Sequence, residues 1–211
     1  MSYKDQFDYI RQTFALETPA LKAIRERTTD KNDQISISPE EGRMLQVLIK
    51  LAGIKTIVEI GTLSGYSAQW MADALPADGH IYTLEKDEKR AAMAHENLRH
   101  QKITLLTGDA LETLSSLNAK GPFDMVFIDA DKLHYMHYLR WAEVHIRKGG
   151  LIVGDNTLLF DTVWRNEPND RVRQTALQVM RDFNQRLADP DKYTGILLPT
   201  SDGMTVAIKN F

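Results

Sequence analysis

From Thr56 onward, short continuous runs of apolar residues alternate with longer segments in which apolar residues recur at helical spacing. The short runs predict strands that are buried on both faces. Strands that alternate with helices imply a parallel, doubly wound sheet. The predicted strands cover residues 56–60, 80–85, 102–107, 123–129 and 150–155.

The last part of the chain has a different pattern. Two strand-like runs, 193–198 and 204–209, are joined only by residues 199–203. So short a connection predicts an antiparallel hairpin. The expected fold class is therefore α/β: a doubly wound, Rossmann-like sheet, mostly parallel, with an antiparallel C-terminal hairpin and flanking helices.

Residues 1–52 precede the alternating pattern and are predicted to form a helical extension. Apolar residues recur there at helical spacing, and Pro19 stands near a helix start. Ser38 is followed by a proline at the first helical position and by Glu41 three residues later. This is the pattern of a capping box, so a helix should begin at Pro39.

Length and composition limit the possibilities further. A chain of 211 residues without repeats or linkers favours a single domain, 1–211. The net charge of -3 and the scattered basic residues give no indication of tight nonspecific binding to nucleic acid. The absence of cysteine excludes disulfides and thiolate chemistry. With no secretion signal and no apolar run of about 20 residues, we expect a cytoplasmic protein without a membrane partner.

The turn after the first predicted strand carries the first chemical signal. Gly61 and Gly65 permit a backbone geometry and a close approach that a Cβ would prevent, and Ser64 is expected to cap the following helix. The next predicted strand ends on Glu85, twenty positions after Gly65. A carboxylate at that place is suited to accept hydrogen bonds from both hydroxyls of a ribose. Both features point to an adenosine cofactor.

The spacing of the glycines bears on which cofactor this is. Gly-x-x-x-Gly departs from the Gly-x-Gly-x-x-Gly of nicotinamide dehydrogenases, which makes that alternative less favoured. Glu59 ends the strand just before the turn and suits a ligand that carries positive charge. S-adenosylmethionine carries a sulfonium and an ammonium, so a methyltransferase is favoured over a hydride-transfer enzyme.

Oxygen-bearing side chains end two further strands. Asp129 follows the strand at 123, and Asp155 with Asn156 follows the strand at 150. Because ligands bind beyond the carboxyl ends of such strands, these side chains are expected to gather in one site. They form a hard oxygen set suited to Mg²⁺, Mn²⁺ or Ca²⁺. Taken singly, Asp129 could instead cap the next helix, and Asp155 with Asn156 could form a turn.

Lys132 lies three residues beyond Asp129. Near a bound cation and a sulfonium, its charged form would be disfavoured, which would free the amine to act as a base. An isolated surface lysine normally has no such role, so this interpretation depends on the neighbours of Lys132.

Taken together, these motifs resemble the cation-dependent class I O-methyltransferases, which include the catechol and caffeoyl-coenzyme A O-methyltransferases and their bacterial relatives. The resemblance runs from about Ser36 to the C-terminus. It rests on Ser38–Gly42, Val58–Thr62, Gly65–Ser67, Glu85, Gly108–Ala110, Phe127–Lys132 with Tyr135, Gly149–Gly150 and Asp155–Asn156.

The resemblance implies a role for each matching residue. The metal ligands of the family fall on Asp129, Asp155 and Asn156, and its catalytic lysine falls on Lys132, with Asp129 as its catalytic neighbour. A cation would lower the pKa of a catechol-like hydroxyl, Lys132 would take the proton, and the oxyanion would attack the methyl group of S-adenosylmethionine. The implied cofactor contacts are Ile37, Glu59, Gly61, Thr62, Ser67, Glu85, Asp109, Ala110, Asp129 and Asp131.

The natural acceptor is less clearly indicated. The plant caffeoyl-coenzyme A enzymes carry tryptophan where this chain has Leu159, so that ester is not favoured. The stretch Phe160–Arg173, with Trp164 and Arg165, is expected to line or cover the acceptor site. A small phenolic acceptor is the first hypothesis. Methylation of a hydroxylated uridine in tRNA and binding of S-adenosylmethionine without catalysis remain alternatives, and relatives of this kind are commonly homodimers.

Overall fold

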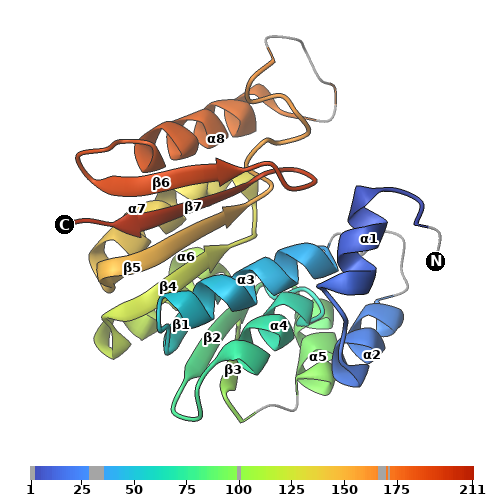
Figure 1. The fold of residues 1–211 in the computed structure, drawn as a ribbon. Helices are drawn as coiled ribbons and strands as arrows, with labels where there is room; N and C mark the ends of the chain where they lie inside the picture. Colours follow the sequence, from blue (N-terminus) through green and yellow to red (C-terminus); the bar gives the residue numbers. More distant parts are fainter. Residues whose placement is uncertain (1–2, 29–35, 99–100, 166–169, 171) are drawn as a thin grey trace. The chain divides into compact units, whose positions relative to one another are not determined.

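The computed structural model describes residues 3–28, 36–98, 101–165, 170 and 172–211. Seven strands form one sheet in the order β3-β2-β1-β4-β5-β7-β6 (Figure 1). The β2–β3, β1–β4 and β4–β5 pairs are parallel, whereas β5–β7 and β6–β7 are antiparallel. The predicted α/β class, with its mostly parallel sheet and C-terminal hairpin, is confirmed.

The chain divides into two compact units: 1–55 with 62–108, and 56–61 with 109–211. The single-domain assignment of 1–211 stays a prediction. In the part of the chain that the structure describes, no helix is long and apolar enough to cross a membrane.

The first unit contains the N-terminal helices and the strand pair β2–β3. Helix α3 packs against α4, α2 packs against α4, and α1 packs against α3. Trp70 is fully buried in this packing, and a Cβ at Gly42 would lie 2.6 Å from its ring. The elements are α1 (Gln6–Thr13), α2 (Pro19–Arg27), α3 (Pro39–Leu51), α4 (Tyr66–Ala74), β2 (His80–Glu85), α5 (Glu88–Asn97) and β3 (Ile103–Thr107).

The second unit contains the rest of the sheet. Helix α7 packs against β4 and β5, α8 packs against β6 and β7, and the two helices contact each other (Figure 1). Its elements are β1 (Thr56–Ile60), α6 (Ala110–Thr113), η1 (Leu114–Lys120), β4 (Phe123–Ile128), η2 (Lys132–His134), α7 (Tyr135–His145), β5 (Ile146–Asp155), α8 (Gln174–Leu187), β6 (Tyr193–Leu198) and β7 (Met204–Lys209).

The predicted capping box at α3 is confirmed. The Ser38 hydroxyl accepts a hydrogen bond from the Glu41 backbone N–H at 3.3 Å, and the Glu41 carboxylate accepts one from the Ser38 N–H at 2.7 Å. The predicted cap at Ser64 is wrong. Helix α4 begins after Gly65, which serves as the N-cap in a left-handed conformation (φ 88°) and provides no side-chain hydrogen bond.

Strand β5 begins at Ile146, earlier than the predicted residue 150. Its first turn-like residues, Arg147 to Gly150, are polar or glycine and hide the strand from an apolar pattern. They are nevertheless part of the strand, since Ile146 pairs with Phe123 of β4. Gly149 interrupts the extended backbone (φ 75°), and the register shifts before Leu151 pairs with Met125.

Candidate active site

In the first unit, Glu85 is held in place at the end of β2. One carboxylate oxygen accepts a hydrogen bond from the Leu63 N–H at 2.8 Å, and the other accepts one from the Asp87 N–H at 2.9 Å. The residue is only 7% exposed. Each oxygen of an ionised carboxylate can accept more than one hydrogen bond. The carboxylate is therefore oriented by the backbone and keeps acceptor capacity for a ligand.

The turn that begins at Thr62 lies beside this carboxylate. The hydroxyls of Thr62 and Thr83 are 2.5 Å apart, which joins the turn to β2 a second time. Ser64 is fully buried, and its hydroxyl has no hydrogen-bond partner among the described residues. Ser67, in the first turn of α4, is also buried. Thr62, Ser67 and Glu85, which the sequence assigned to the cofactor, thus come from connected elements.

Ile37 is the remaining candidate of the first unit. Ile37 is 6% exposed, and it immediately precedes Ser38, the N-cap of α3. The capping box therefore fixes the backbone next to Ile37.

In the second unit, the ends of β1 and β4 approach each other very closely. The Asp129 N–H donates to the Ile60 carbonyl at 2.9 Å. Gly61 has φ 101°, and a Cβ there would lie 1.9 Å from the Asp129 carbonyl oxygen. Only glycine fits this position. Glu59, directly before, is completely buried. The chain order reverses between β1 and β4, and such a switch point is where open α/β sheets bind ligands.

Asp129 directly follows β4, and Asp155 is the last residue of the neighbouring β5. Ile128 pairs with Gly154 at the last position of the parallel β4–β5 register, so the two aspartates come next on neighbouring strands. Asp155 is 3% exposed, and its carboxylate accepts a hydrogen bond from the Asn156 N–H at 2.8 Å. Asn156 is in the left-handed region (φ 54°), which asparagine tolerates better than most residues.

These three residues offer two carboxylates and a carboxamide, all hard oxygen donors. Among the described residues, no group of three His, Asp or Glu side chains is arranged to hold a metal ion, and this set has two carboxylates with an amide as the third donor. The donor chemistry of the predicted set therefore fits a hard divalent cation.

Lys132 points to this same group of residues. Its Nζ lies 3.2 Å from the Asp129 carboxylate and donates a hydrogen bond to the Tyr135 phenol at 2.7 Å. The Lys132 side chain is 21% exposed. An amine that is partly accessible and has two fixed neighbours is suited to exchange a proton with a ligand.

Tyr135 belongs to the motif that carried the family resemblance, but the sequence assigned it no role in the site. Its hydroxyl lies 3.0 Å from the Ile128 carbonyl and 2.8 Å from the Asp155 carbonyl, at the ends of β4 and β5. Burial raises the pKa of Tyr135 well above its usual value, and the charges of Asp129 and Asp155 raise it further. Its spacing of three residues from Lys132 was the available signal, since residues three apart share a helix face.

Asp109 and Asp131 both cap short helices. The Asp109 carboxylate accepts from the Leu111 N–H at 2.9 Å, and the Asp131 carboxylate accepts from the Leu133 N–H at 3.1 Å. Their charges both act on Tyr138, whose pKa is raised to about 12 chiefly by burial and then by these two aspartates. The two acids therefore lie near one another, and Ala110, next to Asp109, is buried.

The segment after Asn156 has an unusual backbone. Leu159, Phe160 and Asp161 are consecutive left-handed residues, with φ between 50° and 62°. The Phe160 N–H donates to the Asp202 carboxylate at 2.7 Å, which fixes the segment to the β6–β7 connection. Leu159 is buried, whereas Phe160 and Trp164 are 56% and 62% exposed. Of the predicted acceptor stretch, residues 166–169 and 171 lie outside the described residues.

Comparison with known proteins agrees with this geometry. Residues 11–210 match the family model described as O-methyltransferase. The chain is 38% identical over 212 residues to a catechol O-methyltransferase of Niastella koreensis, covering 95% of this chain and 94% of that protein. It is 34% identical to caffeoyl-CoA O-methyltransferase 1 of Zea mays, covering 96% and 83%.

A solved structure shows the same relationship. The O-methyltransferase of Bacillus cereus, crystallised in complex with S-adenosylhomocysteine, is 31% identical and covers 96% of each chain, with a TM-score of 0.86. Sequence and structure therefore agree on the assignment, and the resemblance inferred from the motifs is confirmed. The chain belongs to the O-methyltransferase family.

Proposed function

We propose that this protein transfers a methyl group from S-adenosylmethionine to a hydroxyl of a catechol-like small molecule, with a divalent cation held by Asp129, Asp155 and Asn156. The observation that carries the proposal is the position of Lys132: its amine contacts both Asp129 and Tyr135 at the ends of β4 and β5. Family membership and the names of the catechol and caffeoyl-CoA relatives support the same chemistry.

We assign a separate binding role to each group of cofactor residues in the first unit. Glu85, oriented by two backbone N–H groups, would accept hydrogen bonds from the ribose hydroxyls. The first turn of α4 is proposed to present backbone N–H groups to the ligand, as the starts of helices commonly do. Bound S-adenosylmethionine supplies the methyl group. The buried hydroxyl of Ser64 is a further donor or acceptor at this turn.

Glu59, Gly61, Asp109, Ala110, Asp129 and Asp131 are the proposed contributions of the second unit to cofactor binding. Glu59 is a buried acid at the end of β1, where a cationic portion of the ligand would be stabilised. Gly61 keeps the backbone accessible because it has no Cβ.

When bound, the cation would supply a Lewis acid that lowers the pKa of an acceptor hydroxyl. Lys132 must present a neutral amine in order to accept the proton at Nζ. The ammonium that results would be stabilised by the Asp129 carboxylate at 3.2 Å and the Tyr135 phenol at 2.7 Å. The deprotonated acceptor oxygen then bonds to the methyl carbon as the bond from carbon to sulfur breaks. The products are the methyl ether and S-adenosylhomocysteine.

Phe160 and Trp164 are candidates to contact an aromatic acceptor. Both are exposed, and both follow Asp155 and Asn156 closely in the chain. Exposed aromatic rings favour stacking with a planar phenol. Phe160 lies within the left-handed turn at residues 159–161, and its N–H is held by the Asp202 carboxylate.

The proposal is tested by measuring S-adenosylhomocysteine formed by the purified protein from S-adenosylmethionine and caffeic acid. We expect turnover with Mg²⁺ and its loss with EDTA, restored by excess Mg²⁺. Turnover that EDTA does not affect would contradict the role of the cation. Binding of S-adenosylhomocysteine without turnover of any catechol would contradict the acceptor class and would direct the search to tRNA.

A further inference from the structure

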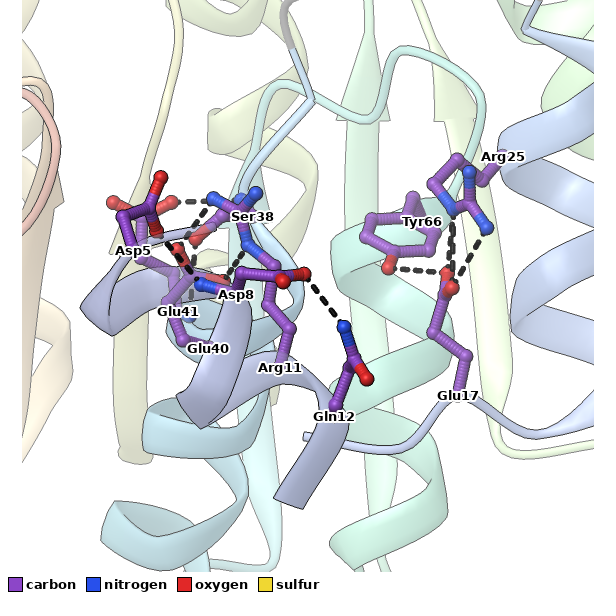
Figure 2. A network of polar contacts seen from close by, with 10 residues as sticks. All are labelled: Asp5, Asp8, Arg11, Gln12, Glu17, Arg25, Ser38, Glu40, Glu41 and Tyr66. Atoms are coloured by element: carbon purple, nitrogen blue, oxygen red, sulfur yellow. Dashed lines mark hydrogen bonds and ion pairs between the residues drawn. The ribbon is translucent and has the colours of Figure 1, made fainter. Parts of the chain in front are cut away.

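The first residue of α4 is tied to the N-terminal part of the chain. Tyr66 directly follows Gly65 and directly precedes Ser67, and it is 2% exposed. Its hydroxyl donates a hydrogen bond to the Glu17 carboxylate at 2.7 Å (Figure 2). Glu17 lies in the connection between α1 and α2. One hydrogen bond therefore joins that connection to the start of the helix proposed to face the cofactor.

The Glu17 carboxylate is itself held firmly. Arg25 donates to it from Nε at 2.8 and 3.1 Å and from Nη2 at 2.8 Å. Figure 2 shows the carboxylate with the Tyr66 hydroxyl on one side and the Arg25 guanidinium on the other. Burial by itself raises the pKa of Glu17, but the hydrogen bonds from Arg25 and Tyr66 bring it below its usual value. The group is a charged acceptor, and such hydrogen bonds are stronger than neutral ones.

A second attachment holds the same connection. Arg43 of α3 donates from Nε to the Phe14 carbonyl at 2.8 Å and from Nη1 to the Gln46 side chain at 2.7 Å. Gln46 in turn donates to the Trp70 carbonyl in α4 at 2.8 Å. The α1–α2 connection is thus fixed at Phe14 through α3 and at Glu17 through Tyr66, and both routes lead to α4.

We propose that Glu17 is a positioning residue for cofactor binding: by accepting the Tyr66 hydrogen bond it fixes the start of α4, and so couples the order of the N-terminal helices to occupancy of the adjacent turn. This inference rests on the proposed function, because it takes the Thr62–Ser67 segment to hold S-adenosylmethionine. Coupling between two sites is reciprocal. If the contact strengthens cofactor binding, the bound cofactor must stabilise the N-terminal helices by the same factor.

Two variants test the coupling. Tyr66→Phe removes only the hydroxyl, and Glu17→Gln keeps the size of the side chain but removes its charge. Each is expected to raise the Kd for S-adenosylhomocysteine, measured by calorimetry, about 5-fold to 20-fold, which is in the lower part of the usual range for coupling between two sites. The KM for S-adenosylmethionine should rise by a similar factor, with kcat at saturation within about twofold. The double variant should be no worse than the single ones.

Glu40→Gln is the matched control. Glu40 accepts two hydrogen bonds from Arg11, each 2.7 Å, and joins α1 to α3 without involving α4 (Figure 2). The Glu40→Gln substitution removes the charge of a carboxylate that is also hydrogen-bonded to an arginine, in the same N-terminal helices. We expect the Kd for S-adenosylhomocysteine to stay within about twofold of the original value.

The reciprocal effect is read from limited trypsin cleavage at Lys22, Arg25 or Arg27. Saturating S-adenosylhomocysteine should slow this cleavage in the original protein by the factor found for the Kd, and should have little effect in Tyr66→Phe. If the original protein binds S-adenosylhomocysteine and both variants bind it equally well, the coupling is refuted while the proposed function stands. If the original protein does not bind it, the proposed function and this inference both fail.

Discussion

The amine of Lys132 lies 2.7 Å from the phenol oxygen of Tyr135, three residues along the chain. That phenol is also within hydrogen-bond distance of the Ile128 and Asp155 carbonyls. A single buried hydroxyl therefore connects the proposed base to the ends of β4 and β5. The precision of such positioning strongly affects rate, because misplacement by about 1 Å can cost on the order of a hundredfold.

Replacing Lys132 by methionine should lower kcat about 10²-fold to 10⁴-fold, the usual contribution of a general base, with little effect on the Kd for S-adenosylhomocysteine. Tyr135→Phe should lower kcat about 10-fold to 100-fold because the amine loses its fixed partner. In the Lys132→Met background, Tyr135→Phe should have no further effect on kcat. Equal effects in both backgrounds would show that Tyr135 does not act through Lys132.

The control for this pair is Tyr193→Phe. Tyr193 is also a buried tyrosine, and its hydroxyl donates to Glu143 at 2.5 Å rather than to a residue of the site. The Tyr193→Phe variant should be less stable by about 1–3 kcal/mol, as expected for a lost hydrogen bond to a charged group, and its kcat should not change.

Gly61→Ala should be severely destabilising. Its Cβ would lie 1.9 Å from the Asp129 carbonyl oxygen, at a φ of 101° that side chains rarely adopt. We expect a loss of about 3 kcal/mol or more in the free energy of unfolding, measured with urea. Gly53→Ala is the matched control: Gly53 has φ 61° and open space around the added Cβ. The backbone conformation alone should cost about 1–2 kcal/mol there.

Asp155→Asn tests the proposed cation site directly. Removing one of two carboxylates should weaken Mn²⁺ binding, measured by calorimetry without any substrate, by at least about 10-fold. The control is Asp182→Asn, which changes an exposed carboxylate of α8 that accepts a hydrogen bond from Gln178. This variant should bind Mn²⁺ as tightly as the original protein. Equal Mn²⁺ affinity in both variants would exclude Asp155 as a ligand.

The free energy of unfolding should depend on pH in part through the carboxyl group of Glu143. Burial raises the pKa of Glu143, but hydrogen bonds from Arg186 and Tyr193 and the charge of Arg186 lower it below its ordinary value of 4.5. A carboxyl with a lowered folded pKa contributes stability above pH 4.5 and loses it as the pH falls through the folded value.

Glu143→Gln should therefore lower the free energy of urea unfolding at pH 7 by about 1–3 kcal/mol. The difference from the original protein should shrink as the pH falls below 4.5. A difference that stays constant from pH 7 to about pH 3 would contradict this account.

Most of the architecture followed from local patterns. Apolar runs predicted the strands, and the short connection at 199–203 predicted the hairpin, because burial and loop length act within a few residues. The polar ends of β4 and β5 were predictable for the same reason. The earlier start of β5 was not, because it depends on pairing with Phe123, a contact distant in sequence.

The contacts that organise the site were harder to foresee. Ser64 matched the preference for a cap, yet the left-handed Gly65 begins the helix and leaves the Ser64 hydroxyl buried. Tyr135 belonged to a recognised motif but had no assigned role, and Glu17 belonged to no motif; the roles of both come from tertiary contacts. Propensity describes what a residue can do locally, whereas the folded chain decides which partner it meets.

Strand β7 lies between β5 and β6, although β6 comes before it in the chain. Among the strands that the structure describes, β6 pairs with β7 alone, so β6 cannot join the sheet before β7 exists. During synthesis, the edge of β5 that pairs with β7 therefore stays unpaired while the 48 residues between Asp155 and Met204 are made. Open edges attract foreign strands. In this interval the unpaired edge of β5 is available to a strand of another chain.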